Sequence, residues 1–466
     1  MSDRPSCSSN SVGILAKAAG RILSFPRNNA VRLFVVLIIA VAGCRQAVPR
    51  TPQGNDSGKQ RETTDAQAGN SGNMLDFAAV SAILARGPVD LACKTDTMPS
   101  DRGKLIVYCS LDTGLQSFIT RLMNQYHPRF GACAVINSKT GRVLAFASHQ
   151  EPGTPKVGGR LFLRNVFPAA SIYKTITAAA AIETARYTVD TKVPITGRSH
   201  TLYMSQLRKN INSPKEIPFE DAYAQSINPV FGRIGMYGVG KKTFEEYNER
   251  FGFNAAIPFE LPTDTSKVTV PDDTTYEMAQ LASGYNRKTS ISPLHGALIA
   301  SAVAEGGFMP CPRLVDSIAT LGGECLYRSV PAAWKTPISD STAAELKAMM
   351  GQVVDSGTAR RTFRLLKRCN GADLLECGGK TGSIKVDSLG NIEWFIGFAV
   401  KKDDPDGHLA LAVVTAHGGN LTVHSHFIGA EIFRKLLCPP GTEPLRPAPT
   451  GRVRSHRVHH PAKSNS

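Results

Sequence analysis

The clearest pattern along the chain is a series of short apolar runs, separated by polar turns and by longer stretches of helical character. Two apolar runs, 132–136 and 142–147, flank the five residues Asn137-Ser138-Lys139-Thr140-Gly141. Apolar runs on either side of turn residues that end in Gly predict a β-hairpin. Ala-, Ile- and Leu-rich stretches predict helices over 172–185, 293–304 and 341–354, the last with a Ser/Thr start and apolar residues three and four apart.

The C-terminal part of the chain returns to strands. Three apolar segments, 382–386, 394–400 and 409–415, predict strands, and 427–437 predicts a final helix. Two strands, then helices, then three strands and a helix are typical of an α+β domain. We therefore expect a five-stranded antiparallel sheet flanked by helices, together with an all-helical subdomain, within residues 105–437.

The N-terminus has the composition of an export signal. Basic residues precede an apolar run over 33–42, which ends at Val41-Ala42-Gly43-Cys44. A bilayer-spanning helix needs about twenty apolar residues, whereas a short apolar core after basic residues predicts a secretory signal, here 1–44. Its last four residues resemble a bacterial lipobox, which implies cleavage before Cys44, acylation of its thiol and a membrane-anchored, extracytoplasmic (periplasmic) chain. An uncleaved anchor or a buried segment is the alternative.

Three further segments differ from the central domain. Residues 45–73 are rich in Gln, Gly, Ser, Thr and Asp and predict a flexible linker, because they cannot bury enough apolar surface to fold. Residues 74–104 form a small N-terminal extension. Residues 438–466 are rich in Pro, Arg and His and predict a disordered basic tail.

The charge balance gives little further information about function. The chain has 54 Lys and Arg against 38 Asp and Glu, a formal net charge of +16, which suits an anionic membrane surface, a cell-wall polymer or a nucleic acid. Much of the excess lies in the two ends, and no nucleic-acid motif occurs, so we expect no nucleic-acid partner. Ten Cys residues in an exported chain permit disulfides, whose pairing stays open.

Three short motifs occur in order within the predicted domain: Ser171-Ile172-Tyr173-Lys174 at the start of the Ala-rich helix, Ser226-Ile227-Asn228, and Lys380-Thr381-Gly382 entering a strand. Each motif alone is common. Together and in this order they resemble the S-x-x-K, S-x-N and K-T-G set of penicillin-binding proteins and serine β-lactamases.

The residue types suit nucleophilic catalysis. A serine hydroxyl needs a base, and residues three apart share a helix face, so Lys174 can reach the Ser171 hydroxyl. Burial and the charge of Lys380 would lower the pKa of Lys174. At the first turn of a helix, the Ser171 N–H is free to stabilise an oxyanion, with the Ser383 N–H as the second donor.

Structural roles are the alternatives. Ser171 could be a plain helix N-cap, Lys380 a solvated strand residue, and the second motif a loop before Pro229. His424-Ser425-His426 hints at a metal, but no third ligand is evident, and without a Cys-x-x-Cys we expect no zinc ribbon. The joint occurrence of the motifs favours an active site without metal or cofactor.

Further segments resemble the penicillin-binding transpeptidase domain: Ser110-Leu111-Asp112-Thr113-Gly114-Leu115-Gln116, Phe167-Pro168-Ala169-Ala170-Ser171, Ser292-Pro293-Leu294-His295, Gly357-Thr358-Ala359 and Trp394-Phe395-Ile396-Gly397-Phe398. Three departures stand out. Ala169-Ala170 replaces the usual proline-glycine, and His295 and Glu305 stand where glutamine and asparagine are common.

The resemblance implies a D,D-transpeptidase or D,D-carboxypeptidase that acts on D-Ala-D-Ala stem peptides of peptidoglycan through an acyl-serine and binds β-lactams covalently. It implies that Ser171 is the nucleophile and Lys174 the base. Ser226 would relay the proton, Asn228 would hold the substrate amide, and Lys380 and Thr381 would bind the terminal carboxylate. Gly382 and Ser383 would form the strand edge that faces the substrate backbone. A β-lactamase-like hydrolase or β-lactam sensor and a non-catalytic cell-wall scaffold are the alternatives. The sequence leaves the acceptor amine and any protein partners open.

Overall fold

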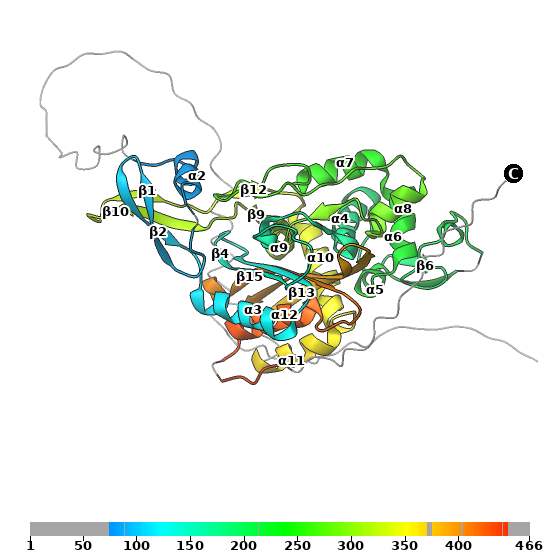
Figure 1. Cartoon of the computed structure of the whole chain (residues 1–466). Helices are drawn as coiled ribbons and strands as arrows, with labels where there is room; N and C mark the ends of the chain where they lie inside the picture. The colour runs from blue at the N-terminus through cyan, green and yellow to red at the C-terminus, as the bar shows by residue number, and fades with distance from the viewer. Residues whose placement is uncertain are drawn as a thin grey trace, which may run out of the picture. The chain divides into compact units, whose positions relative to one another are not determined.

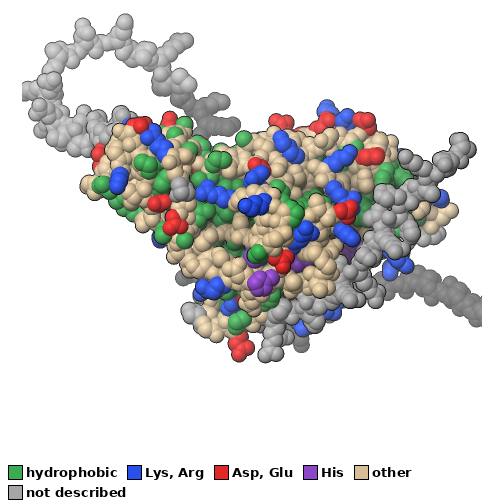
Figure 2. Space-filling model, viewed as in Figure 1, with side chains coloured by type: hydrophobic (Ala, Val, Ile, Leu, Met, Phe, Trp, Pro, Cys, Tyr) green, Lys and Arg blue, Asp and Glu red, His purple; other side chains and the backbone are tan. Residues whose placement is uncertain are grey.

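The computed structural model describes residues 74–87, 89–212, 214–370, 375–401, 404–439 and 441–445. The predicted signal segment with Cys44 and the linker 45–73 lie outside these residues, as does the tail beyond 445. Within the described part of the chain, no helix is long and apolar enough to cross a membrane. Figure 2 shows Lys and Arg side chains interspersed with Asp and Glu over the face in view.

A five-stranded antiparallel sheet organises the domain (Figure 1). In spatial order its strands are β13 (Leu375–Val386), β14 (Gly390–Lys401), β15 (His408–His417), β3 (Phe130–Asn137) and β4 (Val143–Gln150). The expected hairpin is β3 and β4, and the three late strands are β13 to β15. Pairing of β15 with β3, for example Ala412 opposite Ala134, joins the two groups into one sheet. The predicted α+β fold with a five-stranded sheet is confirmed.

Helices cover both faces of this sheet because its strands are apolar on both sides. Successive residues of β14 point to opposite faces: Trp394 lies against Gly296 of α9 (Pro293–Ala304), and Phe395 lies against Gly429 of α12 (Ser425–Leu437). Further helices around the sheet are α3 (Thr113–Tyr126), α10 (Asp340–Asp355) and α11 (Arg360–Asn370). Every residue of α9 is buried, so this helix forms the centre of the core.

A helical region adjoins the β13 edge. It contains α4 (Lys174–Ala185), α5 (Phe219–Ala224), α6 (Asn228–Ile234), the π-helical turn η4 (Gly235–Val239), α7 (Lys241–Arg250) and α8 (Tyr276–Ser283). Short two-stranded sheets lie in this region or next to it. They pair β5 (Phe167–Pro168) with β8 (Ser290–Ile291), β6 (Lys192–Ile195) with β7 (Lys215–Pro218), and β9 (Met309–Pro310) with β12 (Ala333–Lys335). The 3₁₀ turns are η1 (Leu161–Leu163), η2 (Ala170–Tyr173), η3 (Met204–Leu207) and η5 (Pro405–Gly407).

Two element boundaries differ from the sequence prediction in ways that matter for the site. The Ala-rich α-helix begins at Lys174, and Ser171 lies in the preceding 3₁₀ turn η2 instead of in the first α-helical turn. Strand β13 begins at Leu375, so Lys380-Thr381-Gly382 lies inside a strand instead of at its entrance. Tertiary contacts explain both differences. Pairing with β14 extends strand β13, and packing around η2 reshapes the start of the Ala-rich helix, at ends that local propensity leaves undecided.

A second sheet joins the N-terminal extension to the middle of the chain. Strands β1 (Thr95–Ser100) and β2 (Gly103–Cys109) pair with β10 (Val315–Thr320) and β11 (Cys325–Arg328), and α2 (Phe77–Ala85) contacts β1. The expected boundary at 104/105 falls inside β2.

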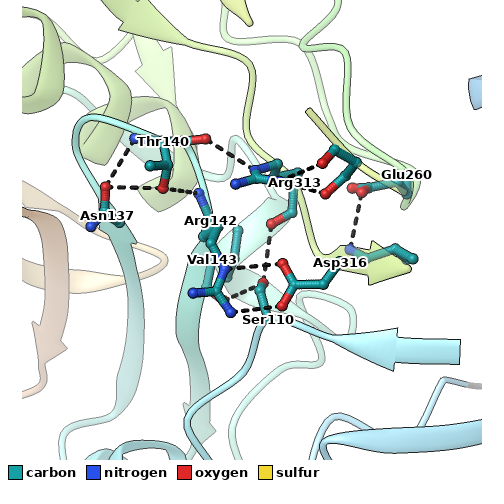
Figure 3. A network of polar contacts seen from close by, with 10 residues as sticks. Ser110, Asn137, Thr140, Arg142, Val143, Glu260, Arg313 and Asp316 are labelled. Atoms are coloured by element: carbon teal, nitrogen blue, oxygen red, sulfur yellow. Dashed lines mark hydrogen bonds and ion pairs between the residues drawn. The ribbon is translucent and has the colours of Figure 1, made fainter. Parts of the chain in front are cut away.

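A polar network fastens this second sheet to the β3–β4 hairpin (Figure 3). The guanidinium of Arg142 binds both carboxylate oxygens of Asp316, at 3.0 and 2.6 Å. Arg313 Nε donates to the Thr140 carbonyl at 3.1 Å, and the Ser110 hydroxyl donates to the Val143 carbonyl at 2.7 Å. A bidentate Arg–carboxylate pair with this geometry is directional, so the network orients the two sheets relative to one another.

The first residues of the predicted tail are held on α12. Arg434 and Glu431 form a buried ion pair, with contacts of 3.0 and 2.9 Å. Arg434 Nη1 donates to the Thr442 carbonyl at 2.9 Å, and the Leu445 N–H donates to Glu431 at 2.6 Å. Cys438 is disulfide-bonded. Thr442 and Leu445 are therefore held against α12, and the predicted tail beyond 445 lies outside the described residues.

Candidate active site

The three sequence motifs meet at one place. Lys174 Nζ lies 2.7 Å from Ser171 Oγ and 2.8 Å from Asn228 Oδ1, and it also donates to the Ser283 carbonyl. Lys380 Nζ lies 2.9 Å from Ser226 Oγ. These contacts link η2, α4, the start of α6 and the middle of β13. The juxtaposition that the sequence predicted for Ser171, Lys174, Ser226, Asn228 and Lys380 is present.

The turn that carries Ser171 is held by its neighbours. Ala170, Ile172 and Tyr173 are each about 1% exposed, whereas Ser171 is partly exposed. The Tyr173 hydroxyl donates to Asn248 Oδ1 at 2.9 Å. The side chains around the serine are thus anchored in the core, and the hydroxyl itself faces accessible space.

Gly284 supports this turn from behind. Its φ is +67°, in the left-handed region, and a Cβ built there would lie 1.9 Å from the Ala170 carbonyl oxygen and 3.0 Å from the Ser171 nitrogen. Any side chain at position 284 would displace the backbone that carries Ser171. Glycine therefore permits both the turn after α8 and its close contact with η2.

The second half of the site is formed by Ser226 and Lys380. Ser226 has φ +55° and is 7% exposed, so its backbone lies in a region that favours glycine or asparagine. Lys380 is completely buried, donates to the Thr381 carbonyl at 2.9 Å, and places its ammonium 5.3 Å from the centre of the Tyr223 ring. The unusual backbone conformation of Ser226 directs its hydroxyl to Lys380, and the Tyr223 ring packs against the Lys380 ammonium.

Burial lowers the pKa of both lysines. Burial and, secondarily, the positive charge of Lys380 lower the pKa of Lys174 well below its usual value. Burial lowers the pKa of Lys380 to about 7. Among the described residues, no carboxylate forms an ion pair or hydrogen bond with either lysine, so nothing offsets the desolvation. An uncharged amine at Lys174 can accept the Ser171 proton.

The edge of β13 lies directly against η2, the turn that carries Ser171. A Cβ built at Gly382 would lie 3.1 Å from the Ser171 nitrogen and 3.2 Å from the Ile172 nitrogen, which leaves the backbone N–H groups of η2 close to the strand. Ser383 is exposed at this edge. The Thr381 hydroxyl is 2.6 Å from the Thr358 hydroxyl, so its orientation is set by the loop after α10.

A family model described as the penicillin binding protein transpeptidase domain matches residues 131–437. The chain belongs to this family. The match spans the three short motifs that contain Ser171, Ser226 and Lys380, and the resemblance expected from the sequence is confirmed.

Curated relatives and solved structures agree with this assignment. The transpeptidase-family chain is similar to Stage V sporulation protein D of Bacillus subtilis (strain 168), with 24% identity over 363 residues that cover 74% of this chain and 54% of that protein. It is also similar to Peptidoglycan D,D-transpeptidase PbpA of Mycobacterium tuberculosis (strain ATCC 25618 / H37Rv), with 24% identity over 259 residues, 48% of this chain and 51% of that protein. The chain thus spans about half the length of these curated relatives.

Two solved structures share the fold. One is the D,D-transpeptidase domain of a peptidoglycan glycosyltransferase from Eggerthella lenta, with TM-score 0.57 and 22% identity over 80% of this chain and 88% of that chain. The other is penicillin-binding protein A from M. tuberculosis in its penicillin G acyl-enzyme complex, with TM-score 0.54 and 20% identity over 71% of this chain and 79% of that chain.

The departures from the family pattern are accommodated in different ways. Ala170 adopts φ +49°, a conformation that costs a non-glycine residue about 1–2 kcal/mol. His295 is fully buried with Nε2 2.7 Å from the Phe251 carbonyl, and burial lowers its pKa to about 4. Glu305 accepts from the Ser138 hydroxyl and contacts His408 at 2.9 Å. Among the described residues, neither His295 nor Glu305 contacts Ser171 or Lys174.

Several site residues could not be selected from sequence alone. The Ser283 carbonyl contacts Lys174, the Tyr223 and Phe231 rings lie under the two ammonium groups, and Thr358 contacts Thr381. Thr358 could have been selected from the sequence, because it lies in the Gly-Thr-Ala segment that resembles the family. No sequence pattern pointed to the other residues. His424 pairs with Glu393 at 3.0 Å, and no group of three metal-ligating side chains occurs within the described ranges.

Proposed function

We propose that this transpeptidase-family chain is a peptidoglycan D,D-transpeptidase or D,D-carboxypeptidase that works through an acyl-Ser171 intermediate on D-Ala-D-Ala stem peptides. The observation that carries the proposal is the 2.7 Å contact between Lys174 Nζ and Ser171 Oγ at a buried amine of lowered pKa. A lowered pKa increases the fraction of the amine that is uncharged and able to act as a general base. The named activity of PbpA and the penicillin G acyl-enzyme of the M. tuberculosis protein support it.

The proposed acylation step uses each motif. Lys174 takes the Ser171 proton as Oγ bonds to the carbonyl carbon of the penultimate D-alanine. The Ser171 and Ser383 N–H groups stabilise the oxyanion, a contribution of about 100- to 1,000-fold per donor. Ser226 relays the proton from Lys174 to the leaving amine as the C–N bond breaks, so that both side chains return to their starting protonation states, and Asn228 binds the substrate amide. Lys380 and Thr381 bind the terminal carboxylate, and Gly382 leaves room for the substrate backbone.

A β-lactamase-like activity is less well supported. Fast hydrolysis of an acyl-serine needs a base that activates water. Among the described residues, neither Ser171 nor Lys174 contacts a carboxylate. We therefore propose slow hydrolysis of β-lactam adducts, with an amine or water as the acceptor for the natural acyl group.

We also propose an extracytoplasmic location with a lipid anchor at Cys44. The support is the lipobox-like Val41-Ala42-Gly43-Cys44 and the peptidoglycan substrate named for the relatives. Fractionation of cells that express wild type or Cys44→Ala tests it: the variant should leave the membrane fraction, and an unchanged membrane fraction would argue against the anchor.

Intact mass after exposure to benzylpenicillin tests the enzymatic proposal. Wild type should gain the mass of one benzylpenicillin and lose it slowly, because no carboxylate among the described residues contacts Ser171 or Lys174 to activate a water. Ser171→Ala should gain nothing, since the nucleophile is absent. Ser383→Ala serves as the control, because its backbone N–H remains. An adduct on Ser171→Ala would place the nucleophile elsewhere.

Acylation is expected to slow as the pH rises through about 7. The charged form of Lys380 binds the carboxylate, and burial lowers its pKa to about 7. Above that value the second-order acylation rate constant should fall by up to about tenfold per pH unit. Stopped-flow acylation by benzylpenicillin between pH 6 and 9 measures this descending limb.

The methyl ester of benzylpenicillin is the matched control for this profile. It lacks the carboxylate that Lys380 binds, so its descending limb should disappear. A flat profile for benzylpenicillin itself between pH 6 and 9 would remove Lys380 from carboxylate recognition.

A further inference from the structure

The outer edge of β13 continues past the residues proposed for catalysis. β13 is the first strand of the five-stranded sheet, so one of its edges pairs with no strand among the described residues. The Leu389 N–H donates to the Val386 carbonyl at 3.2 Å, which turns that carbonyl toward the hairpin with β14. Main-chain groups alternate in direction along a strand, so the Ser383 and Lys385 carbonyls face the open edge. This edge therefore offers main-chain hydrogen-bonding groups at residues 383 and 385.

Arg287 occupies one of these two positions. It lies in the loop between α8 and β8, and its Nε donates to the Lys385 carbonyl at 2.9 Å. Arg287 is exposed, and within the described ranges its Nη1 and Nη2 form no hydrogen bond and no ion pair. The guanidinium thus lies beside the strand edge, and two of its nitrogens can still donate to a ligand.

The loop that carries Arg287 is held in a defined shape. The Asn286 side-chain oxygen accepts from the backbone N–H groups of Lys288 and Thr289, at 3.0 and 2.8 Å. The Thr289 carbonyl accepts from the Ala169 N–H at 2.9 Å, which ties the loop to the segment directly before η2. The position of Arg287 is therefore set relative to both η2 and the β13 edge.

The acylation step proposed above gives a substrate one direction on this edge. Lys380 and Thr381 bind the terminal carboxylate and the Ser383 N–H binds the oxyanion, so the acyl part of the substrate runs toward residue 385, antiparallel to β13. With the penultimate substrate residue opposite Ser383, the residue two positions before it is opposite Lys385, about 7 Å further along the strand. Arg287 lies beside that substrate residue.

We propose that Arg287 selects acyl donors that carry a carboxylate on the residue two positions before the penultimate one. This inference rests on the proposed function, because it uses the substrate direction given by that site. Arg287 Nε takes the place of the substrate N–H that would otherwise reach the Lys385 carbonyl. Main-chain pairing of the substrate ends there, and Nη1 and Nη2 bind the carboxylate, since planar guanidinium groups match carboxylates in geometry.

Two derivatives of 6-aminopenicillanic acid test the charge requirement through the same acylation of Ser171. One carries acetyl-Glu-Ala on its amino group and the other carries acetyl-Gln-Ala. The β-lactam carbonyl takes the place of the penultimate residue's carbonyl, so the Glu or Gln side chain lies beside Arg287. Each compound is made with both configurations of this residue, and the rate at which adduct mass appears gives the second-order rate constant.

The acid should acylate wild type about fivefold faster than the amide at low salt in at least one configuration, the upper range for an exposed ion pair. Added NaCl at about 0.5 M should reduce this ratio, because it screens exposed charges. The ratio is the informative quantity, since a purely structural role of Arg287 would change both rate constants equally.

Variants locate the effect. Arg287→Gln should bring the ratio of acid to amide to about one, because the glutamine side chain has no charge. Arg287→Lys, which keeps the charge without the planar fork, should retain part of the ratio. Lys288→Gln is the matched control, because it removes the neighbouring exposed cation, and its ratio should stay within about twofold of wild type.

Three results would overturn this proposal: equal rates for acid and amide in wild type in both configurations, a ratio that survives Arg287→Gln, or an equal loss of the ratio in Arg287→Gln and Lys288→Gln. The last result would assign the effect to the general charge of the loop. Failure of the proposed function has a different signature, because wild type would then gain no mass from benzylpenicillin or from either derivative.

Discussion

Replacing Lys174 by methionine is expected to lower the second-order rate constant of acylation by benzylpenicillin by about 100- to 10,000-fold, the usual contribution of a positioned general base. Methionine keeps the length of the buried chain but cannot accept the proton of Ser171, whose hydroxyl lies 2.7 Å from the lysine amine. The rate at which the adduct mass appears measures the effect.

Lys385→Met is the matched control for this prediction, because Lys385 is exposed on the same strand as the K-T-G motif. It should acylate within about twofold of wild type, as surface substitutions usually perturb little. Acylation of Lys174→Met within tenfold of wild type would mean that another group removes the proton.

Replacing Gly284 by alanine is expected to lower the second-order rate constant of acylation by about 100-fold, although Gly284 is not among the residues proposed for catalysis. Misplacement of a reacting group by about 1 Å has this order of effect, and the added Cβ would lie 1.9 Å from the Ala170 carbonyl oxygen. The positive φ adds a conformational cost of about 1–2 kcal/mol to the folded state. Stopped-flow acylation and thermal unfolding measure the two effects separately.

Gly419→Ala provides the comparison. A Cβ at Gly419 would have no atom within 4 Å, and its φ is outside the positive range. This variant should match wild type in both rate and melting temperature. If Gly284→Ala lost stability but acylated normally, the close contact with η2 would have no role in positioning the nucleophile.

The main architecture could be predicted from the sequence, because the hydrophobic pattern is regular in the most densely packed part of the core. Strands β3 and β15 and helix α9 are apolar almost throughout, and their lengths and flanking turns separate the strands from the helix. Element ends were less predictable. Strand β13 extends back to Leu375 through pairing with β14, which places Lys380 inside the sheet. Nothing in the local sequence of residues 375–381 indicates that they pair with β14, which follows them in the chain.

The proposed reacting groups could be selected from the amino-acid sequence, because the order of Ser171-x-x-Lys174, Ser226-x-Asn228 and Lys380-Thr381-Gly382 is specific even without a structure. The environment of these side chains could not be predicted in this way. The left-handed backbone of Ser226, the aromatic rings beneath the two lysines and the close approach of Gly284 to η2 depend on contacts between segments far apart in the chain. The chemistry of a lysine amine is set by its burial and neighbours rather than by its residue type, and burial is a property of the assembled fold.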